Sequence, residues 1–283
     1  MAEKLWIVDG HSLIYRAMHA SRVRGTQSLD GRSTKGVAAF LNILTDLLDT
    51  YAPDMFVMTL DVPRSRTFRR AIYPDYKVNR NNKKQPLIAN MREQVDWCAE
   101  LCRLFGFPVL QVDGFEADDT IASLVDVCSG PDLECVIVSR DKDLMQLIGP
   151  HCRMYNHHDG VFIDEKAVED SWGVPPSMVV DVQTLMGDAC DNVPGVPKFG
   201  KERAIKYVRQ YGSLDNMLNE IDMLPKWASK SLTEADLDLC RQLVELRKDV
   251  PLKVRWKDLK FNGLNYKAAG PLLSELGINN WIS

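Results

Sequence analysis

Acidic residues recur at the ends of short apolar segments, where their carboxylates could act together. One or two acids at such positions would be explained by capping of the helix that follows. Nine acids directed at one place would instead repel each other by several kcal/mol or take up protons. The pattern therefore predicts that divalent cations bind among these side chains. The candidate metal ligands are Asp9, Asp61, Glu116, Asp118, Asp119, Asp141, Asp143, Asp188 and Asp191.

The donor atoms of this set narrow the choice of metal. All nine are oxygen donors, without His or Cys, which favours Mg²⁺ or Mn²⁺ over Zn²⁺. Their number favours two ions, an arrangement that suits in-line attack on a phosphodiester. In this hypothesis one ion lowers the pKa of a bound water, and the other stabilises charge on the phosphate and on the leaving oxygen. Acid clustering alone leaves phosphatases and other phosphoryl-transfer enzymes open.

The elements that would gather these acids follow from the apolar periodicity. Short apolar runs predict strands over residues 5–9, 55–61, 108–112 and 135–139, and helical spacing predicts helices over 36–51, 86–105 and 116–128. Strands that alternate with helices predict an α/β fold with a doubly wound, mostly parallel sheet. Sites in such sheets lie outside the carboxyl ends of the strands, so the acids should meet at that edge.

Two regions depart from this alternation. Residues 64–84 show no clean periodicity, and from about Trp172 onward helical stretches dominate, notably over 201–211 and 233–248. We therefore expect an α/β core over residues 1–171, which includes the 64–84 segment. A smaller helical region over residues 172–283 should carry a Gly/Pro hairpin at 192–200.

The 64–84 segment is rich in Arg, Lys and Tyr and contains a single acid, Asp75. Phosphate neutralisation combined with aromatic stacking is typical of single-strand binding. A solvated basic loop is the alternative, but a position directly after the acid at residue 61 favours a substrate-gripping element. The DNA-binding candidates here are Arg69, Arg70, Tyr73, Tyr76, Lys83 and Lys84.

The hairpin at 192–200 leads into the predicted helix 201–211. A glycine turn before a helix N-terminus can expose backbone N–H groups to a phosphate, and lysines add charge. A plain structural loop explains the same residues equally well. The DNA-binding candidates of this region are Gly195, Lys198, Gly200, Lys201 and Arg203.

Composition bounds the remaining possibilities. The chain has 283 residues and a net charge of −4, which by itself argues against nucleic acid, but its charges are segregated. It lacks an apolar run of the roughly 20 residues that span a bilayer, and its start lacks the apolar core of a signal peptide. We therefore expect a cytoplasmic protein that does not bind membranes, with seven free cysteines and a turn at His157-His158.

Several motifs resemble those of the bacterial and phage 5′ nucleases, the 5′-3′ exonuclease (flap endonuclease) family, which includes the 5′-nuclease domain of bacterial family-A DNA polymerases. Val8-Asp9-Gly10-His11-Ser12 with Tyr15-Arg16-Ala17 is similar to the family's opening. Residues 68–80 resemble its arch, and the motifs at 114–119, 141–144 and 187–196 follow in order. The resemblance covers roughly residues 1–210.

The resemblance implies a resolvase-like (PIN-like) core, a helical arch and a helix–three-turn–helix element. It implies a first metal group of Asp9, Asp61, Glu116 and Asp118, with Asp119 shared, and a second group of the remaining four acids. It assigns catalytic roles to Lys77, Arg80 and Arg16, and it implies K⁺ at the hairpin. The implied enzyme is a monomeric 5′-3′ exodeoxyribonuclease and flap endonuclease, acting in DNA replication or repair on DNA with a 5′ flap or free 5′ end. Its products carry a 5′-phosphate and a 3′-hydroxyl.

The sequence also departs from the family's pattern. Arg140 stands where the family usually has Gly, and Cys190 where it usually has Ser. The hairpin lacks one glycine, and Glu202-Arg203 replaces a Lys-Thr pair. Every metal carboxylate is present, so we expect the chemistry to be kept. The changes bear instead on duplex binding and on the monovalent-ion site.

Two other functions stay open at this point. A ribonuclease of a related α/β fold would share the acids, usually in a shorter chain without arch or hairpin. A catalytically inactive branched-DNA-binding protein would keep the basic elements and lose carboxylates. The chain could be a stand-alone nuclease or an excised domain.

Overall fold

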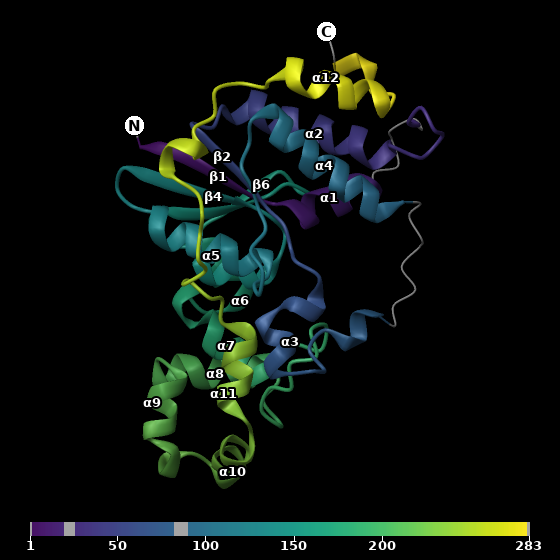
Figure 1. Ribbon diagram of the computed structural model, residues 1–283. Helices are drawn as coiled ribbons and strands as arrows, with labels where there is room; N and C mark the ends of the chain where they lie inside the picture. The colour runs from purple at the N-terminus through teal and green to yellow at the C-terminus, as the bar shows by residue number, and fades with distance from the viewer. Residues whose placement is uncertain (1, 20–25, 82–89, 282–283) are drawn as a thin grey trace.

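The computed structural model describes residues 2–19, 26–81 and 90–281 of the chain. A six-stranded sheet in the order β3-β2-β1-β4-β5-β6 forms its centre (Figure 1). Every neighbouring pair is parallel except β5 and β6, which form an antiparallel hairpin. The expectation of a doubly wound, mostly parallel sheet is confirmed. The strands are β1 Glu3–Asp9, β2 Met55–Thr59, β3 Val109–Leu110, β4 Leu133–Val138, β5 Cys152–Asn156 and β6 Val161–Ile163.

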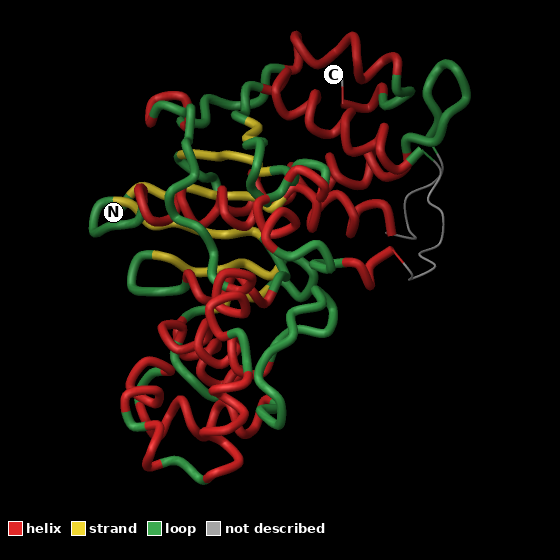
Figure 2. The backbone as a smooth tube through the Cα atoms, turned by 60° about the horizontal axis from the view of Figure 1, so that its bottom comes forward, coloured by secondary structure: helices red, strands yellow, loops and turns green. Residues whose placement is uncertain are grey.

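The two faces of the sheet are buried under different helices, as Figure 2 shows. On β1, Trp6 and Val8 face one core and Leu5 and Ile7 face the other, because successive strand side chains point to opposite faces. The first core lies under α1 (Gly10–His19), α2 (Lys35–Tyr51), α4 (Met91–Phe105) and α12 (Tyr266–Glu275). The second lies against α5 (Ala117–Cys128), α6 (Glu165–Trp172) and α7 (Val179–Met186).

The hairpin of β5 and β6 was not predicted as strand. Both strands are short, and β6 has three residues, too few for a period to show. The predicted turn at His157-His158 is confirmed, since it joins these two strands. Elsewhere the predicted elements agree within a few residues, and the predicted helix 201–211 matches α8 (Lys201–Tyr211). The start of the helix predicted over 86–105 falls partly outside the described residues.

The helices between α7 and α12 gather below the sheet in Figure 1. The helix predicted over 233–248 is wrong: α10 (Lys226–Glu234) ends there, and α11 (Leu237–Val244) starts anew. The side chain of Asp236 accepts a hydrogen bond from the Leu239 N–H, so it caps α11 and breaks the continuity. The further elements are α3 (Phe68–Ile72), α9 (Leu214–Asn219) and the 3-10 helices Arg64–Arg66, Val78–Asn81, Lys142–Leu147, Pro176–Met178, Ile221–Met223, Trp256–Leu259 and Asn279–Trp281.

The last segment returns to the α/β core. Helix α12 packs on α4, and Ala269, Leu273 and Leu276 enter the core above the sheet. The proposed division at residue 172 stays a prediction, and within it the region 172–283 is not a single packing unit. Among the described residues, no helix is long and apolar enough to cross a membrane. All seven cysteines are free thiols, as expected.

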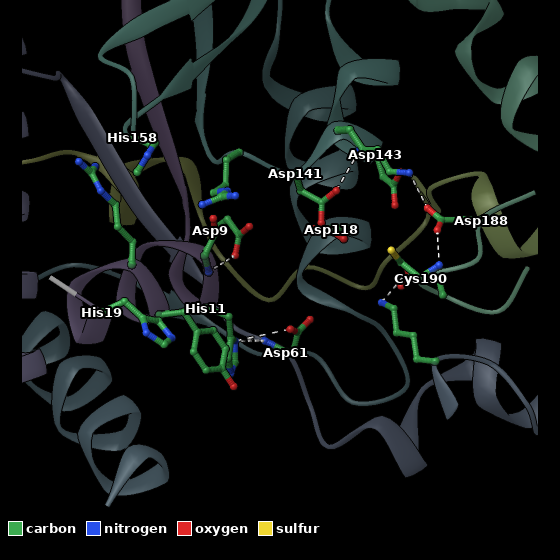
Figure 3. Close-up of a pocket in the computed structure, with 17 residues that line it drawn as sticks. Asp9, His11, His19, Asp61, Asp118, Asp141, Asp143, His158, Asp188 and Cys190 are labelled. Carbon is green, nitrogen blue, oxygen red and sulfur yellow. Dashed lines mark hydrogen bonds and ion pairs between the residues drawn. The ribbon is translucent and has the colours of Figure 1, made fainter. Parts of the chain in front are cut away.

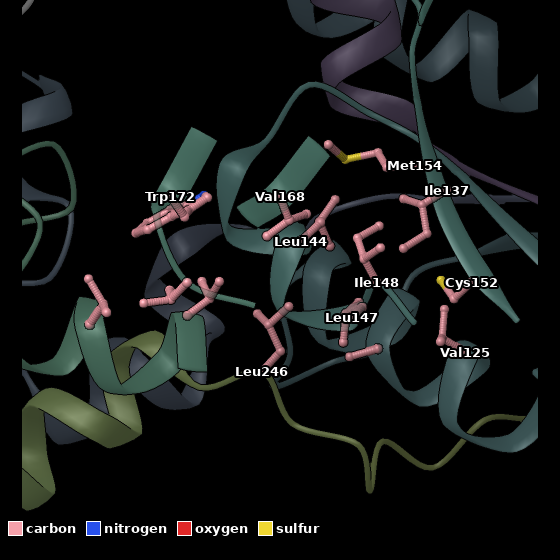
Figure 4. Close-up of a cluster of buried hydrophobic side chains, with 14 of the residues drawn as sticks. Val125, Ile137, Leu144, Leu147, Ile148, Cys152, Met154, Val168, Trp172 and Leu246 are labelled. Atoms are coloured by element: carbon pink, nitrogen blue, oxygen red, sulfur yellow. The ribbon is translucent and has the colours of Figure 1, made fainter. Parts of the chain in front are cut away.

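An apolar cluster under the sheet fixes the segment that follows β4. Leu144 and Leu147 of the 3-10 helix Lys142–Leu147 point into this cluster (Figure 4). There they meet Ile137 of β4, Met154 of β5 and Trp172 of α6. Because these side chains are anchored below, the acids at residues 141 and 143 are held at the carboxyl edge of the sheet.

Candidate active site

A cleft of about 1210 Å³ opens at the carboxyl edge of the sheet (Figure 3). Its acidic lining comes from the ends of β1, β2 and β4, the start of α5 and the loop after α7. The structure therefore brings together seven of the nine predicted carboxylates, and their role as metal ligands stays a prediction. The seven are Asp9, Asp61, Asp118, Asp141, Asp143, Asp188 and Asp191.

Ser139 links the acids of β1 and β4. Its hydroxyl donates to Asp9 Oδ2 at 2.7 Å and accepts from the Asp141 N–H at 3.0 Å. The Ser12 N–H donates to Asp9 Oδ1 at 3.0 Å. Ser139 was not among the predicted residues, although a polar residue at the end of a buried strand was a usable signal.

A side chain from α7 holds the next acid. Gln183 Nε2 donates to Asp143 Oδ1 at 2.5 Å, and the Asp143 N–H donates to Asp141 Oδ1 at 3.0 Å. Gln183 is a buried residue of α7. Its hydrogen bond therefore joins the helical region to the cleft. Gln183 was not predicted either, because nothing in the surrounding sequence marks a mid-helix Gln as part of a distant site.

The loop after α7 is shaped by two glycines with left-handed backbones, Gly187 and Gly195. They lie back to back, and a Cβ at Gly195 would fall 2.5 Å from the Gly187 backbone nitrogen. Asp188 and Val193 exchange backbone hydrogen bonds, which closes the loop. The prediction that Gly195 presents its backbone to DNA is wrong, because this glycine is buried against Gly187.

Asp119 does not face the cleft. It is fully buried, and its oxygens accept from both terminal nitrogens of Arg69 at 2.7 and 2.8 Å. It also accepts from the backbone N–H groups of Glu116 and Arg247, at 3.1 and 3.0 Å. Protein donors occupy both oxygens of Asp119, and its predicted share in a metal ion stays a prediction.

Arg69 and Tyr76 are buried too, so the prediction that they bind DNA is wrong. Arg69 is 1% exposed and also donates to the carbonyls of Leu243 and Glu245, each at 2.9 Å. Tyr76 is 5% exposed, and its hydroxyl donates to Glu116 Oε2 at 3.0 Å. We call these four residues, Arg69, Tyr76, Glu116 and Asp119, the Arg69 brace. It joins the base of the predicted arch to α5 and to the end of α11.

Glu116 and Lys77 lie where the brace meets the cleft. Lys77 has a left-handed backbone (φ 56°) and lines the cleft. Its ammonium lies 2.6 Å from Glu116 Oε1 and 3.6 Å from Asp191 Oδ2. Glu116 lines a neighbouring pocket together with Lys77 and Asp61. Both predicted roles, metal ligand and catalytic lysine, stay predictions.

The other predicted basic residues fall into two groups. In the arch segment, Tyr73 is half-buried and half-buried Arg70 donates to the Tyr76 carbonyl at 2.9 Å. The Arg80 side chain and the residues Lys83 and Lys84 lie outside the described part of the structure.

At the hairpin, Lys198, Gly200, Lys201 and Arg203 are exposed. Arg203 donates to the Lys198 carbonyl at 2.9 Å, and Lys201 lies over the Trp172 ring. Their contact with DNA stays a prediction.

Burial and mutual repulsion oppose ionisation of several cleft carboxylates. Burial, together with the charges of Asp61 and Asp141, raises the pKa of Asp9 to about 7 although Ser12 and Ser139 counteract it. Burial and the charge of Asp141 raise the pKa of Asp143 to about 7. Burial, with neighbouring carboxylates, raises the pKa of Asp118 well above its ordinary value. At these three carboxylates, nearby positive charge does not offset burial and repulsion.

Two acids beside lysines behave in the opposite way. Burial opposes ionisation of Glu116, but Lys77 and Arg69 hold the pKa of this carboxyl below its ordinary value. Asp188 is partly desolvated as well, but the hydrogen bond from Lys142, with 2.6 Å between Nζ and Oδ2, keeps its pKa low. A nearby cation is therefore what decides the charge of an acid in this part of the molecule.

The carboxylates fit a hydrated divalent cation. Within the described ranges, no three His, Cys, Asp or Glu side chains converge closely enough to enclose one ion directly. Mg²⁺ keeps several waters and is often held by one or two carboxylates, so spaced aspartates with raised pKa values suit it. The set offers oxygen donors, as Mg²⁺ and Mn²⁺ prefer.

Histidines and an arginine on the cleft wall were not predicted. His11, His19, His158 and Arg140 line it together with the predicted Arg16. His11 Nδ1 accepts from the Asp61 N–H at 3.2 Å and lies 3.6 Å from Asp61 Oδ2. His157-His158 was predicted as a turn without a function.

Comparison with known families gives matches along most of the chain. Residues 4–173 match the family described as 5'-3' exonuclease, N-terminal resolvase-like domain. Residues 174–267 match the 5'-3' exonuclease, C-terminal SAM fold.

Two relatives illustrate the range of matching proteins. A 5'-3' exonuclease of Aquifex aeolicus is 33% identical over 273 residues, which cover 96% of this chain and 91% of the relative. A DNA polymerase I of Rhizobium leguminosarum is 36% identical over 259 residues, 88% of this chain but 25% of the polymerase. The chain thus spans most of such an exonuclease and about a quarter of such a polymerase.

Solved structures share the fold. The phage T5 D15 protein co-crystallised with metal ions has a TM-score of 0.71 at 21% identity, covering 86% of this chain and 88% of that one. The T5 D15 flap endonuclease in a pseudo-enzyme-product complex with DNA and metal ions has a TM-score of 0.68 at 19% identity, covering 99% and 97%. The expected resolvase-like α/β core with a helical C-terminal region is confirmed.

Proposed function

Because this chain belongs to the 5'-3' exonuclease family of nucleases, we propose that it is a structure-specific 5′ nuclease that hydrolyses DNA phosphodiester bonds. One observation carries the proposal: seven aspartates from separate strand ends and loops line one cleft. Burial and the charges of neighbouring carboxylates raise the pKa of several of them. Such a site is arranged for cations and for the phosphate that they bind.

Two ions, Mg²⁺ or Mn²⁺, are proposed to bind in the cleft. The residues that would hold them are Asp9, Asp61, Glu116 and Asp118 for one, and Asp141, Asp143, Asp188 and Asp191 for the other. When bound, such ions supply a nucleophile at neutral pH and stabilise charge on the phosphate. Ser139 and Gln183 orient two of these carboxylates, those of Asp9 and Asp143, and Ser139 also accepts from the Asp141 backbone N–H.

Lys77 is proposed to bind the phosphate that is cleaved, and Arg16 is proposed to bind the same DNA strand beside it. Both line the cleft. The Lys77 ammonium is held at Glu116, and a cation at that carboxylate would compete with it and leave the ammonium for the phosphate. A positive group held close to developing negative charge stabilises the transition state.

The proposed substrate is DNA with a 5′ single-stranded flap or a free 5′ end, cut to leave a 5′-phosphate and a 3′-hydroxyl. The predicted arch at residues 64–84 would admit the single strand, and the exposed cations Lys198, Lys201 and Arg203 would hold duplex backbone. The T5 flap endonuclease of the same fold was solved with DNA and metal ions, which supports this substrate.

We further propose a cytoplasmic monomer, a K⁺ ion at the hairpin 192–200 and a role in DNA replication or repair. Size-exclusion chromatography with light scattering tests the first of these, and a dimer at micromolar concentration would contradict it.

The test of function is cleavage of a 5′-labelled flap duplex with Mg²⁺, Mn²⁺ or EDTA, by wild type and by Asp141→Ala. We expect metal-dependent cutting near the junction by the wild type, lost in Asp141→Ala while binding persists. Binding without cutting under any metal would leave the inactive branched-DNA-binding protein. Faster cutting of a matched RNA flap would favour the ribonuclease.

A further inference from the structure

The cleft has a second, cationic end. In Figure 3, His19 and His158 lie on one side, whereas Asp141, Asp143 and Asp188 lie on the other. Arg16 and Arg140 line the same cleft. We call Arg16, His19, Arg140 and His158 the cationic end. It is built from α1, the segment after β4 and the turn between β5 and β6.

Arg16 is held in place by a neighbour that does not neutralise it. One of its terminal nitrogens contacts His157 Nδ1 at 2.7 Å and also donates to the His157 carbonyl. His157 is 5% exposed, and burial, with the charges of Arg16, Arg140 and His158, lowers its pKa to about 3. The imidazole is therefore neutral and accepts from the guanidinium, which is oriented but keeps its full positive charge.

Arg140 has no anionic partner among the described residues. It is exposed, and within that part of the chain no hydrogen bond or ion pair engages its guanidinium. Its charge instead acts unfavourably on Arg16 and His157. The acid that acts on Arg16 from this side is Asp159, whose Oδ2 accepts from Asn156 at 2.8 Å.

The two lysines of the cleft differ from these arginines. Lys77 is paired with Glu116, and Lys142 with Asp188, each at 2.6 Å. Each lysine therefore has a carboxylate of its own, whereas the guanidiniums at the cationic end repel each other. Like charges gathered on a solvent-open wall are stabilised when an anion binds between them, and guanidiniums suit phosphate oxygens because they donate in a planar fork.

We propose that Arg16, Arg140 and His158 form a subsite for a second phosphate group of the DNA strand, distinct from the phosphate that is cleaved. The proposal rests on the proposed function, since the strand would pass from the acidic side of the cleft to the cationic end. The phosphate is either the terminal monoester of a 5′-phosphorylated strand or an internal diester. Arg140 is the new specificity-determining residue, and His157 is a positioning residue for Arg16.

The test compares Arg140→Gln with Lys166→Gln in the full chain. Both remove one positive charge, but Lys166 is exposed on α6 and pairs with Asp170, away from the cleft. Binding of a fluorescent flap duplex is measured in EDTA by anisotropy at several salt concentrations. We expect Arg140→Gln to weaken binding about fivefold to tenfold and to reduce the slope of log K against log salt by about 0.7 to 0.9. Lys166→Gln should do neither, and Arg140→Lys should recover most of the slope.

The same variants are then assayed for cleavage with Mn²⁺ on flaps with a 5′-phosphate or a 5′-hydroxyl. The loss in Arg140→Gln should appear mainly in KM. A loss confined to the 5′-phosphorylated flap identifies the terminal monoester, and an equal loss on both identifies an internal diester. Equal binding and cleavage by Arg140→Gln and Lys166→Gln would overturn the subsite.

The two proposals fail in different ways. If the wild type cleaves and Arg140→Gln behaves like Lys166→Gln, the subsite is wrong and the nuclease stands. If the wild type does not cleave with any metal but the binding loss of Arg140→Gln persists, the nuclease is wrong and the phosphate subsite stands. Because Arg140 is exposed, an unchanged melting temperature will show that its substitution does not act through folding.

Discussion

The cleft and the Arg69 brace both contain buried acids, but they differ in how the negative charge of these acids is compensated. In the brace, Asp119 and Glu116 are matched by the guanidinium of Arg69 and, for Glu116, by Lys77. In the cleft, burial and repulsion raise the pKa values of Asp9 and Asp143 to about 7. Asp118 and Asp119 are adjacent in sequence, yet they belong to different regions. Burial alone therefore does not decide whether an acid is ionised. The charge of the groups packed against the acid decides it.

This difference separates the part of the molecule that is stable from the part that is reactive. Arg69 of the brace donates to the Asp119 carboxylate and to the carbonyls of Leu243 and Glu245. These bonds tie α3 to α5 and to the end of α11. The cleft keeps uncompensated carboxylates in place through Ser139 and Gln183. The repulsion among these carboxylates favours the binding of cations. The stability of the surrounding fold offsets its cost.

The largest expected effect comes from Asp118→Asn, which removes a cleft carboxylate. Cleavage should fall on the order of 10⁴-fold, about 5 kcal/mol, because a cation ligand is lost. The metal-free protein should be equally or more stable, since repulsion is relieved. Single-turnover cleavage and urea unfolding in EDTA measure both quantities. A large loss of stability with little loss of cleavage would place Asp118 in the brace instead.

The second prediction concerns pH in the absence of metal. The folded pKa of Asp9 and Asp143 is about 7, above the ordinary 3.8, so the folded state binds more protons between these values. Stability contributed by the protonated forms is present at low pH and is lost as the pH rises toward 7. Moving one carboxyl from 3.8 to about 7 corresponds to roughly 4 kcal/mol.

Thermal unfolding in EDTA at pH 5 and pH 8 measures this effect, and added Mn²⁺ at pH 8 should restore stability. A metal-free protein that is more stable at pH 8 would contradict the raised pKa values. The variant Asp9→Asn serves as a control, because it should show a weaker dependence on pH.

The third prediction tests the brace through Asp119→Asn, the neighbour of the first substitution. Arg69 would remain buried with part of its compensation removed, so the free energy of unfolding should fall by about 3 kcal/mol. At a temperature where the variant is folded, cleavage should fall far less than in Asp118→Asn. Urea unfolding decides the point: a variant as stable as the wild type would show that the brace contributes nothing.

The smallest effect is expected for Lys142→Met. Its side chain is 44% exposed, and the ion pair with Asp188 is therefore partly screened by solvent. The free energy of unfolding should change by less than about 1 kcal/mol. Differential scanning calorimetry against wild type measures the change, and a loss comparable to that of Asp119→Asn would mean that cleft and brace are built alike.

The sequence determined where the acids converge. Buried apolar runs alternating with helices specify a parallel sheet, and the carboxyl ends of parallel strands lie at one edge. Asp9, Asp61 and Asp141 follow such runs, so their meeting in the cleft could be predicted from residue order alone. The glycines at 187 and 195 likewise mark a tight loop, although their burial against each other could not be read from the chain.

The tertiary structure decided which charged residues face the cleft. Arg69 and Tyr76 lie in a segment without periodicity, and only the packing of α3 against α5 and α11 buries them. Successive residues of an α-helix point about 100° apart, so Asp118 and Asp119 at the start of α5 must face different neighbours. No local signal says which of the two meets Arg69 and which meets the cleft. That choice depends on elements distant in sequence, because an acid's charge and function are set by what is packed against it.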